Sequence, residues 1–585
     1  MQGMDTQRLI LWVIFSMSLV FLWDRWQQYQ GQPSFFAPSP TQPAPSPETK
    51  AAEKRVEPQA PNGATDASVP NAATAPAASA AGSAAPAGGD AIERPRERIT
   101  VASDLLQLDF DPAGASLVRA ELLQQKIPPD WTASGLIGLV TGKKEDHESE
   151  VVLLEVTDQR YYVAQSGVIG GEFPNHRSAW HALPGARQMA EGQDTLAITF
   201  EAEAGGARVR KTYTLRRGHY DVQVSHEIAN TGAAPITPSV YLQIMRDGNK
   251  PEGQSSFYST FTGPAFYSDK EKFQKIDFSD INKGKATHVK SAPDGWVAMI
   301  QHYFVAAWVP PGGPERDFYS SKFKDNLYIV GTKYALPAIA PGASETSTAS
   351  LYIGPQDQHA LEQLAPGLDL VVDYGWLTVL SKPLFWLLQF LHNGLGNWGW
   401  AIVIATLLIK LALFPLSAAS YKSMARMKEV TPRMMKIREQ YGDDKQKLNA
   451  AMMELYKNEK INPIGGCLPI VVQIPVFLAY YWVLLASVEM RNQPWMLWVH
   501  DLASPDPWFV LPIAMMVTMI VQYKLNPTPP DPVQAKVMAI MPFIFGAMFF
   551  MFPAGLVLYW FVNNLLSIAQ QAYITRNLAK AKPVG

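Results

Sequence analysis

A lysine lies inside a strongly apolar stretch of this chain. The run from Trp398 to Phe414 reads WGWAIVIATLLIKLALF and is long enough to cross the apolar core of a bilayer. Lys410 lies a full turn before the end of this run, and Thr406 lies one turn earlier on the same helical face. A charge at that depth costs about 2.5–3.5 kcal/mol, so such residues usually face a bundle interior or a wet cavity. Two interpretations follow: Lys410 extends to the cytoplasmic headgroups, or it lines a hydrated, positive groove inside the membrane.

The last apolar segment, from Leu556 to about Tyr573, carries polar side chains at helical spacing. The members of this stripe are Trp560, Asn564, Ser567 and Gln571. Polar side chains in spanning helices often hold neighbouring helices together, at about 0.6 kcal/mol each. The stripe is therefore either helix–helix contact or part of a polar groove.

Between these segments, residues 417–462 are polar and contain more Lys and Arg than acidic residues. Gly442, Asp443 and Asp444 divide the segment into two helices, with an aspartate placed to cap the second. The positive excess predicts a cytoplasmic helical hairpin. Its apolar face is rich in methionine, at Met424, Met427, Met434, Met435, Met452 and Met453. These side chains either accept varied apolar partners or pack the two helices together.

Composition excludes several classes of function. A chain of 585 residues is too long for one core, and a net charge of -2 argues against a protein that coats nucleic acid. The single cysteine, Cys467, permits no intramolecular disulfide and is interpreted as a small packing side chain. No phosphate-binding glycine loop is present. We therefore expect no enzyme, no cofactor and no metal site.

The N-terminal part of the chain divides into an anchor and a linker. Residues 1–26 contain a short apolar run, and the bulky residues at its end favour an uncleaved signal anchor over a cleaved signal peptide. Residues 27–95 are rich in Pro, Ala, Ser and Gly and cannot bury a core. We expect a flexible periplasmic linker.

Residues 96–355 have short, alternating, β-rich segments. Arg217-Gly218 separates two of them as a hairpin turn would, and the stretch from Gly295 to Pro310 is apolar enough for buried strands. About 250 residues of this kind predict a large β-sandwich. No catalytic arrangement stands out in it, and His226 and His302 are interpreted as core or surface histidines.

The C-terminal third reads as a polytopic helical membrane region. Residues 373–392 predict an amphipathic helix lying in the outer interface, with a spanning helix as the alternative. Counting the anchor as the first, about six spans are expected with both termini inside. The remaining spans are 396–416, 463–488, 508–523, 536–552 and 555–575, separated by a periplasmic loop at 489–507 and a cytoplasmic loop at 524–535, with a cytoplasmic tail at 576–585.

Three long blocks carry a family resemblance. NPIGGCLPIVVQIPVFLAYYWVL (Asn462 to Leu484), YGDDKQKLNAAMMELYK in the hairpin, and FPAGLVLYWFVNN (Phe552 to Asn564) resemble the YidC membrane protein insertase family. The resemblance implies a periplasmic β-supersandwich similar to sugar-mutarotase folds, with no known enzymatic role. It also implies a hydrophilic groove that is open to cytoplasm and lipid and closed to the periplasm.

In this family the groove centres on a positive residue of the first core span, which here is Lys410 in place of the commoner arginine. Thr406 and Trp560 match positions tied to substrate contact or activity, and Gln473 matches a groove-lining one. A buried lysine can lose its proton whereas arginine stays charged, so we expect standing water around Lys410.

The resemblance implies a chaperone and insertase of the bacterial inner membrane that works alone or with the Sec translocon. The expected partners are nascent membrane proteins, ribosome and signal-recognition machinery, and lipids, without sequence-specific nucleic-acid binding. A secondary transporter would show inverted repeats, which we do not see. A membrane-anchored sugar enzyme would place its chemistry in the β region instead.

Overall fold

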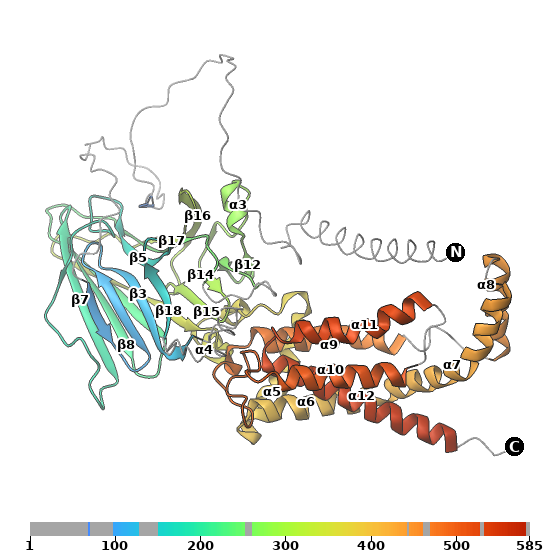
Figure 1. The fold of residues 1–585 in the computed structure, drawn as a ribbon. Helices are drawn as coiled ribbons and strands as arrows, with labels where there is room; N and C mark the ends of the chain where they lie inside the picture. The colour runs from blue at the N-terminus through green and yellow to red at the C-terminus, as the bar shows by residue number, and fades with distance from the viewer. Residues whose placement is uncertain are drawn as a thin grey trace, which may run out of the picture. The chain divides into compact units, whose positions relative to one another are not determined.

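The structure, a computed structural model, describes residues 68–70, 98–127, 150–251, 260–441, 444–459, 468–526 and 532–580. These residues form two compact units, a β domain up to Val372 and a helical domain from Asp373 onward (Figure 1). The predicted anchor, most of the predicted linker, Asp443 and the start of the predicted span at 463–488 lie outside the described residues.

The β domain contains two antiparallel sheets, which confirms the prediction of a large all-β domain. Each sheet has nine strands among the described residues. The first sheet has the order β1 (Ile99–Ala102), β2 (Leu106–Asp111), β3 (Ser116–Lys126), β4 (Glu150–Val156), β5 (Tyr161–Ile169), β10 (Ser239–Asp247), β17 (Leu327–Ala335), β16 (Arg316–Lys324) and β13 (Ser291–Ala292).

The second sheet packs against the first and is built around long, regularly paired strands. Its order is β12 (Gln274–Lys275), β11 (Gly263–Tyr267), β14 (Trp296–Gln301), β15 (Phe304–Val309), β18 (Ser344–Pro355), β9 (Asp221–Asn230), β8 (Ala207–Arg216), β7 (Thr195–Ala204) and β6 (His181–Ala182). The short helices of this domain are α3 (Phe278–Asn282), α4 (Gln358–Leu364) and the 3-10 turn η1 (Leu368–Val371).

Local sequence explains the strands that were predicted. β7 and β8 alternate between buried and more exposed residues, as the two-residue period of a strand requires. β8 and β9 form an antiparallel pair joined at Arg217-Gly218, and Gly218 has φ +73°, which favours glycine. β14 and β15 are buried along almost their whole length, as predicted for the apolar stretch from Gly295 to Pro310.

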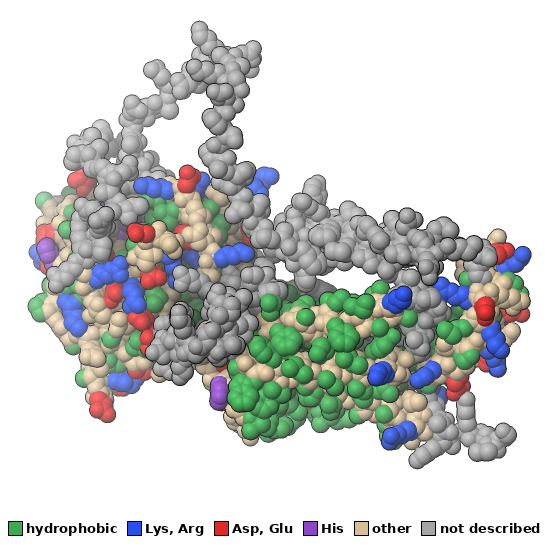
Figure 2. Space-filling view, viewed as in Figure 1, with side chains coloured by type: hydrophobic (Ala, Val, Ile, Leu, Met, Phe, Trp, Pro, Cys, Tyr) green, Lys and Arg blue, Asp and Glu red, His purple; other side chains and the backbone are tan. Residues whose placement is uncertain are grey.

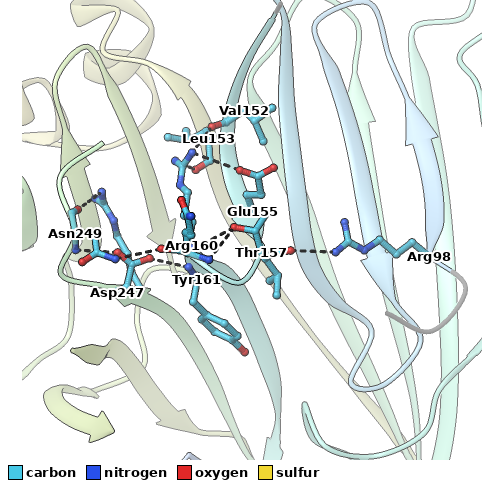
Figure 3. Close-up of polar contacts among 12 residues, drawn as sticks. Arg98, Val152, Leu153, Glu155, Thr157, Arg160, Tyr161, Asp247 and Asn249 are labelled. Carbon is cyan, nitrogen blue, oxygen red and sulfur yellow. Dashed lines mark hydrogen bonds and ion pairs between the residues drawn. The ribbon is translucent and has the colours of Figure 1, made fainter. Parts of the chain in front are cut away.

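A polar network fixes the turn between β4 and β5 (Figure 3). Arg160 donates to the carbonyl oxygens of Val152 and Leu153 on β4. Asp247, at the end of β10, accepts the backbone N–H of Tyr161 at 2.7 Å. The network therefore ties the β4–β5 turn to the neighbouring strand β10.

The helical domain consists of α-helices with two short 3-10 turns among its described residues. The elements are η2 (Gly375–Leu377), α5 (Thr378–Leu395), α6 (Trp398–Ala412), α7 (Phe414–Tyr441), α8 (Lys445–Asn458), α9 (Leu468–Ala486), η4 (Val488–Met490), α10 (Val510–Leu525), α11 (Pro532–Phe549) and α12 (Ala554–Lys580). α6 packs against α5 and α12, and α10 packs against α11 and α12. α12 therefore lies at the centre of the packing.

The predicted helix from Trp398 to Phe414 ends earlier than expected. α6 stops at Ala412, and after Leu413 the chain bends by 67° into α7. The bend coincides with Pro415, which has no backbone N–H to donate to the carbonyl of the preceding turn, yet is tolerated in the first turn of a new helix. The helix boundary therefore differs from the predicted one, and the span at 396–416 stays a prediction.

Within the described residues, each helix taken alone falls short of the length and apolarity needed to cross a bilayer, whereas α6 and α7 together meet the requirement as a bent pair. Shorter apolar helical stretches occur at Gln473–Ala486, Val510–Leu525 and Ala535–Phe549. The expectation of about six spans stays a prediction.

Candidate functional site

Lys410 points into the helix packing and not toward the surface. Its side chain is 4% exposed, and its Nζ donates a 2.8 Å hydrogen bond to Ser567 Oγ on α12. Ser567 Oγ in turn donates to the carbonyl oxygen of Asn563 at 2.7 Å. Within the described part of the chain, no carboxylate forms an ion pair with Lys410. The structure thus places a buried cation at the α6–α12 interface with no counter-charge from the described residues.

Thr406 lies one turn away from Lys410, as predicted, and is also buried. Its hydroxyl donates to the carbonyl oxygen of Ile402 at 2.7 Å, a bond within its own helix. The hydroxyl of Tyr480 on α9 donates to the same carbonyl at 3.4 Å. Thr406 therefore marks the point where α6 meets α9.

The polar stripe of α12 contacts several different neighbours. Ser567 faces Lys410 on α6, whereas Asn564 Nδ2 donates to Thr518 Oγ1 on α10 at 3.0 Å. Gln571 Oε1 accepts a 2.8 Å hydrogen bond from Gln522 Nε2, also on α10. We call the set Lys410, Thr518, Gln522, Asn564, Ser567 and Gln571 the polar seam. Asn564 and Gln571 thus act as helix–helix contacts, while Ser567 meets the buried charge.

Trp560 belongs to an aromatic cluster that lies on the N-terminal side of the polar seam along α12. Its ring stacks on Phe477 of α9 at 5.8 Å and meets Phe549 of α11 at 4.5 Å. Its Nε1–H is buried and has no hydrogen-bond partner among the described residues. The other ring–ring contacts of Trp560 are with Tyr481 and Phe552. Gln473 is half-buried on α9, and the structure does not bring it to Lys410 through a hydrogen bond.

The N-terminal ends of α6 and α12 are joined by the loop between α9 and α10. Asn397 Nδ2 donates to the carbonyl oxygens of Pro494 and Trp495 at 3.1 and 3.0 Å. The indole of Trp495 lies so close to Gly399 that a Cβ there would be 2.1 Å from Trp495 Cδ1. At the start of α12, Gly555 N donates to the carbonyl oxygen of Leu502 at 2.9 Å. We call this loop, residues 491–507, the outer loop.

The outside of the helical domain is apolar. Figure 2 shows a broad face of hydrophobic side chains over the helices, with Lys and Arg gathered toward the α7–α8 end. Exposed apolar side chains on this domain include Leu407, Leu411, Ile513, Val517, Val521, Ile540, Phe543 and Ile544. A continuous apolar face of this kind is typical of contact with lipid or with another protein. α5 likewise exposes Val379, Trp386 and Phe390 while burying Ser381 and Leu388.

The α7–α8 hairpin divides its methionines between two environments. Met427, Met434 and Met452 pack with Val430 between the two helices. Met435 and Met453 are 51% and 66% exposed, and Met424 is half-buried. Asp444 caps α8 by accepting the backbone N–H groups of Gln446 and Lys447, which lower the pKa of its carboxyl together with the Lys447 ammonium. Packing between the two helices thus accounts for Met427, Met434 and Met452, while binding of apolar partners by the exposed methionines stays a prediction.

Two polar partners of the seam were missed from the sequence. Thr518 and Gln522 stand four residues apart in the apolar run of α10, which places them on one helical face. That spacing could have predicted a polar face on this helix. Gln570 was also missed; its Nε2 donates to the Lys410 carbonyl at 3.4 Å, and its buried Oε1 has no hydrogen-bond partner in the part of the chain that the structure describes.

Comparisons with known proteins agree with this two-part architecture. The family model of the YidC periplasmic domain matches residues 98–387, and that of the 60Kd inner membrane protein matches residues 390–581. The chain is 54% identical over 580 residues to the membrane protein insertase YidC of Cupriavidus necator, covering 99% of both chains. The YidC insertase of Bordetella petrii is 53% identical over 581 residues, with the same coverage.

A crystal structure of an active YidC insertase is also similar. The chains share 18% identity over 82% of this chain and 92% of that one, with a TM-score of 0.37. The family models and the full-length relatives define a class of protein in which a large β domain precedes a helical membrane domain. This chain belongs to the YidC family of membrane protein insertases.

Proposed function

We propose that this protein inserts other proteins into the bacterial inner membrane through a hydrated groove centred on Lys410. The observation that carries the proposal is the buried Lys410 ammonium, held by Ser567 inside a bundle whose outside is apolar. A buried cation is expensive, and such residues in membrane helices are usually functional. The relatives are named as insertases and not as enzymes, so the proposed work is positioning and partition, without covalent chemistry.

Standing water in the groove is part of the proposal. Among the residues that the structure describes, the buried Trp560 Nε1–H, Gln570 Oε1 and Gln522 Oε1 have no hydrogen-bond partner. Buried polar groups are usually satisfied, and ordered water is the common partner when protein is not. The methionine-rich hairpin and the groove residues Gln473 and Thr406 are proposed to receive the substrate on the cytoplasmic side.

The mechanism follows from electrostatics. A substrate helix with a short acidic tail brings that tail into the groove, where water and Lys410 lower the cost of removing its charge from bulk water. The membrane potential, negative inside, favours outward movement of an acidic tail by about 2.3 kcal/mol per charge per 100 mV. The apolar helix then moves into lipid, stabilised by burial of its apolar surface. The outer loop, joined to α6 and α12, would close the groove on the periplasmic side.

The topology belongs to the same proposal. About six spans with both termini in the cytoplasm would place the β domain, a supersandwich of the sugar-mutarotase kind, in the periplasm and the α7–α8 hairpin in the cytoplasm. Lys and Arg gathered at the hairpin end of the helical domain support this orientation (Figure 2). The proposed partners are nascent membrane proteins, the Sec translocon, ribosome and signal-recognition machinery, and lipids.

Reconstitution tests the function directly. Purified protein in liposomes would be given a single-helix substrate with a short acidic N-terminal tail, and protection of the tail from external protease would be measured. We expect protection in vesicles that contain the protein and little in empty vesicles of the same lipids. Equal protection in both would contradict the proposal.

A further inference from the structure

A row of mostly polar residues crosses the first sheet of the β domain, on the face that points away from the second sheet. Tyr162 on β5 points inward, because its hydroxyl donates to the Met299 carbonyl of β14. Alternation along β5 and β10 therefore directs Gln165 and Gln243 to the opposite, outer face. In the strand register Gln165, Gln243, Gly331 and Tyr319 lie side by side on four neighbouring strands.

The row is held in one arrangement by its own contacts. The Tyr319 ring lies over Gly331, where a Cβ would be 2.5 Å from the Tyr319 hydroxyl oxygen. That hydroxyl donates to Gln243 Oε1 at 3.0 Å, which orients the amide. Gln243 Nε2 then donates to Gln165 Oε1 at 2.9 Å. The side-chain amide of Gln243 is therefore oriented before any ligand binds, with its NH₂ group at the centre of the row.

Other parts of the β domain flank this row on both sides. On one side Tyr161, Phe323 and Leu327 pack over the apolar residues of this face, next to the turn that Arg160 and Asp247 fix (Figure 3). On the other side the Tyr241 hydroxyl accepts the backbone N–H of His176, which brings the segment after β5 over the sheet. We call the space between these flanks, floored by Gln165, Gln243, Gly331 and Tyr319, the linker slot.

A short piece of the proline- and alanine-rich segment occupies the linker slot. Ser68 is 7% exposed, and its carbonyl oxygen accepts a 3.2 Å hydrogen bond from Gln243 Nε2. Val69 and Pro70 are half-buried. Gln243 itself is fully buried although it lies on an outer sheet face. The hydrogen bond goes to the peptide backbone, so it does not depend on which side chain the segment carries at that position.

We propose that the linker slot is a binding site for uncharged polypeptide segments of small residues and proline. The segment Ser68–Pro70 fills it in the resting chain, and a similar segment of another polypeptide displaces it. The chemistry of the partner follows from the resident: a backbone acceptor aimed at Gln243, small side chains that fit between the flanks, and a proline with little conformational entropy to lose. The inference goes beyond membrane insertion and does not depend on it.

The resident segment Ser68–Pro70 competes with a free peptide for the linker slot, and this competition determines the apparent affinity that we expect for the peptide. A segment in the same chain competes at an effective concentration on the order of mM. A free peptide of equal intrinsic affinity therefore binds the intact chain weakly. Removing residues 64–72 should raise the apparent affinity for the free peptide by at least about tenfold.

The experiment uses the full chain in detergent and a fluorescent peptide of sequence ATDASVPNAATA, which is residues 64–75. Binding is measured by fluorescence anisotropy for wild type and for a variant that lacks residues 64–72. In the deletion background, Gln243→Leu removes the amide donor and Tyr319→Phe removes only the hydroxyl that orients it. Gln223→Leu, at an exposed glutamine of β9, is the matched control.

We expect tighter peptide binding by the deletion variant, loss of binding with Gln243→Leu, a several-fold loss with Tyr319→Phe, and no change with Gln223→Leu. Circular dichroism checks that each variant is folded, and Tyr319→Phe keeps the test decisive if Gln243→Leu unfolds. Equal binding by wild type and the deletion variant, or binding that persists in both slot variants, would overturn the proposal. None of these readouts involves insertion, so failure here leaves the insertase proposal standing.

Discussion

The Lys410 ammonium on α6 donates a 2.8 Å hydrogen bond to the Ser567 hydroxyl on α12, and both side chains are buried. This contact gives the buried charge a hydrogen-bond acceptor and joins the two helices at the polar seam. Ser567→Ala removes the acceptor and leaves the ammonium buried. Loss of such a bond typically costs about 1–3 kcal/mol. We expect reduced stability in detergent and slower insertion of acidic tails, measured by urea unfolding and protease protection, while Ser567→Thr retains both properties.

The contacts between α12 and α10 should behave differently. Asn564 donates to Thr518 Oγ1 as a neutral pair, so Asn564→Ala should lower stability by about 0.6 kcal/mol. The effect on insertion should be the same for substrates with acidic and with neutral tails. A double-mutant cycle with Thr518→Ala measures the coupling energy. Selective loss of acidic substrates in Asn564→Ala would mean that this residue belongs to the charged groove.

Gly399 and Trp495 should form a strongly coupled pair. A side chain at position 399 must displace the Trp495 indole, because a Cβ would lie 2.1 Å from its Cδ1. Gly399→Val should destabilise the outer loop by about 1–3 kcal/mol, as overpacking does. Trp495→Ala should recover part of that loss in the double variant. Additive effects in urea unfolding would show that the indole does not press on this glycine.

Buried histidines should make the β domain sensitive to acid. Burial, together with the nearby Lys211 ammonium, lowers the pKa of His176 and of His226 to about 3, against about 6.5 in an unfolded chain. Between these values the unfolded state binds more protons, so stability is lost as the pH falls from about 6.5 toward 3. Each histidine contributes about 2–3 kcal/mol of this loss by pH 4.5.

Thermal unfolding followed by circular dichroism of the full chain tests this pH dependence. His226→Gln should flatten the fall in melting temperature between pH 6.5 and pH 4.5, whereas His181→Gln, at an exposed histidine, should leave it unchanged. An unchanged pH dependence in His226→Gln would show that the His226 imidazole titrates normally.

Lys211 should make the stability of the β domain depend on pH in the alkaline range as well. Burial lowers the pKa of its ammonium to about 7, so the free energy of unfolding should rise with pH between about 7 and 10.5.

Sequence periodicity predicted which residues share a face but not which neighbour that face meets. The stripe from Trp560 to Gln571 was visible at helical spacing, yet its division between α6, α9, α10 and α11 depends on tertiary packing. Lys410 was predictable because one charge interrupts an apolar run. The sequence did not identify Ser567 as the partner of Lys410; it indicated only the polar stripe of α12, of which Ser567 is one member.

The β domain shows the same limit. Two-residue alternation predicted its strands and the hairpin at Gly218, because local burial dictates that pattern. It did not predict that β5 pairs with β10 or that Gln165 and Gln243 become neighbours, because such pairings join distant segments. The docking of Ser68 had no local signal, since its segment has a composition typical of a linker.

The most direct test of the central claim is insertion of an acidic-tailed substrate by Lys410 variants in proteoliposomes. Wild type would be compared with Lys410→Arg, Lys410→Ala and Lys410→Glu, with a neutral-tailed version of the substrate as control. The account predicts that Lys410→Arg protects the acidic tail as wild type does, while Lys410→Ala and Lys410→Glu leave it outside the vesicle and open to protease. Insertion by Lys410→Ala at the wild-type rate would contradict the account, because a positive charge in the groove would then be unnecessary.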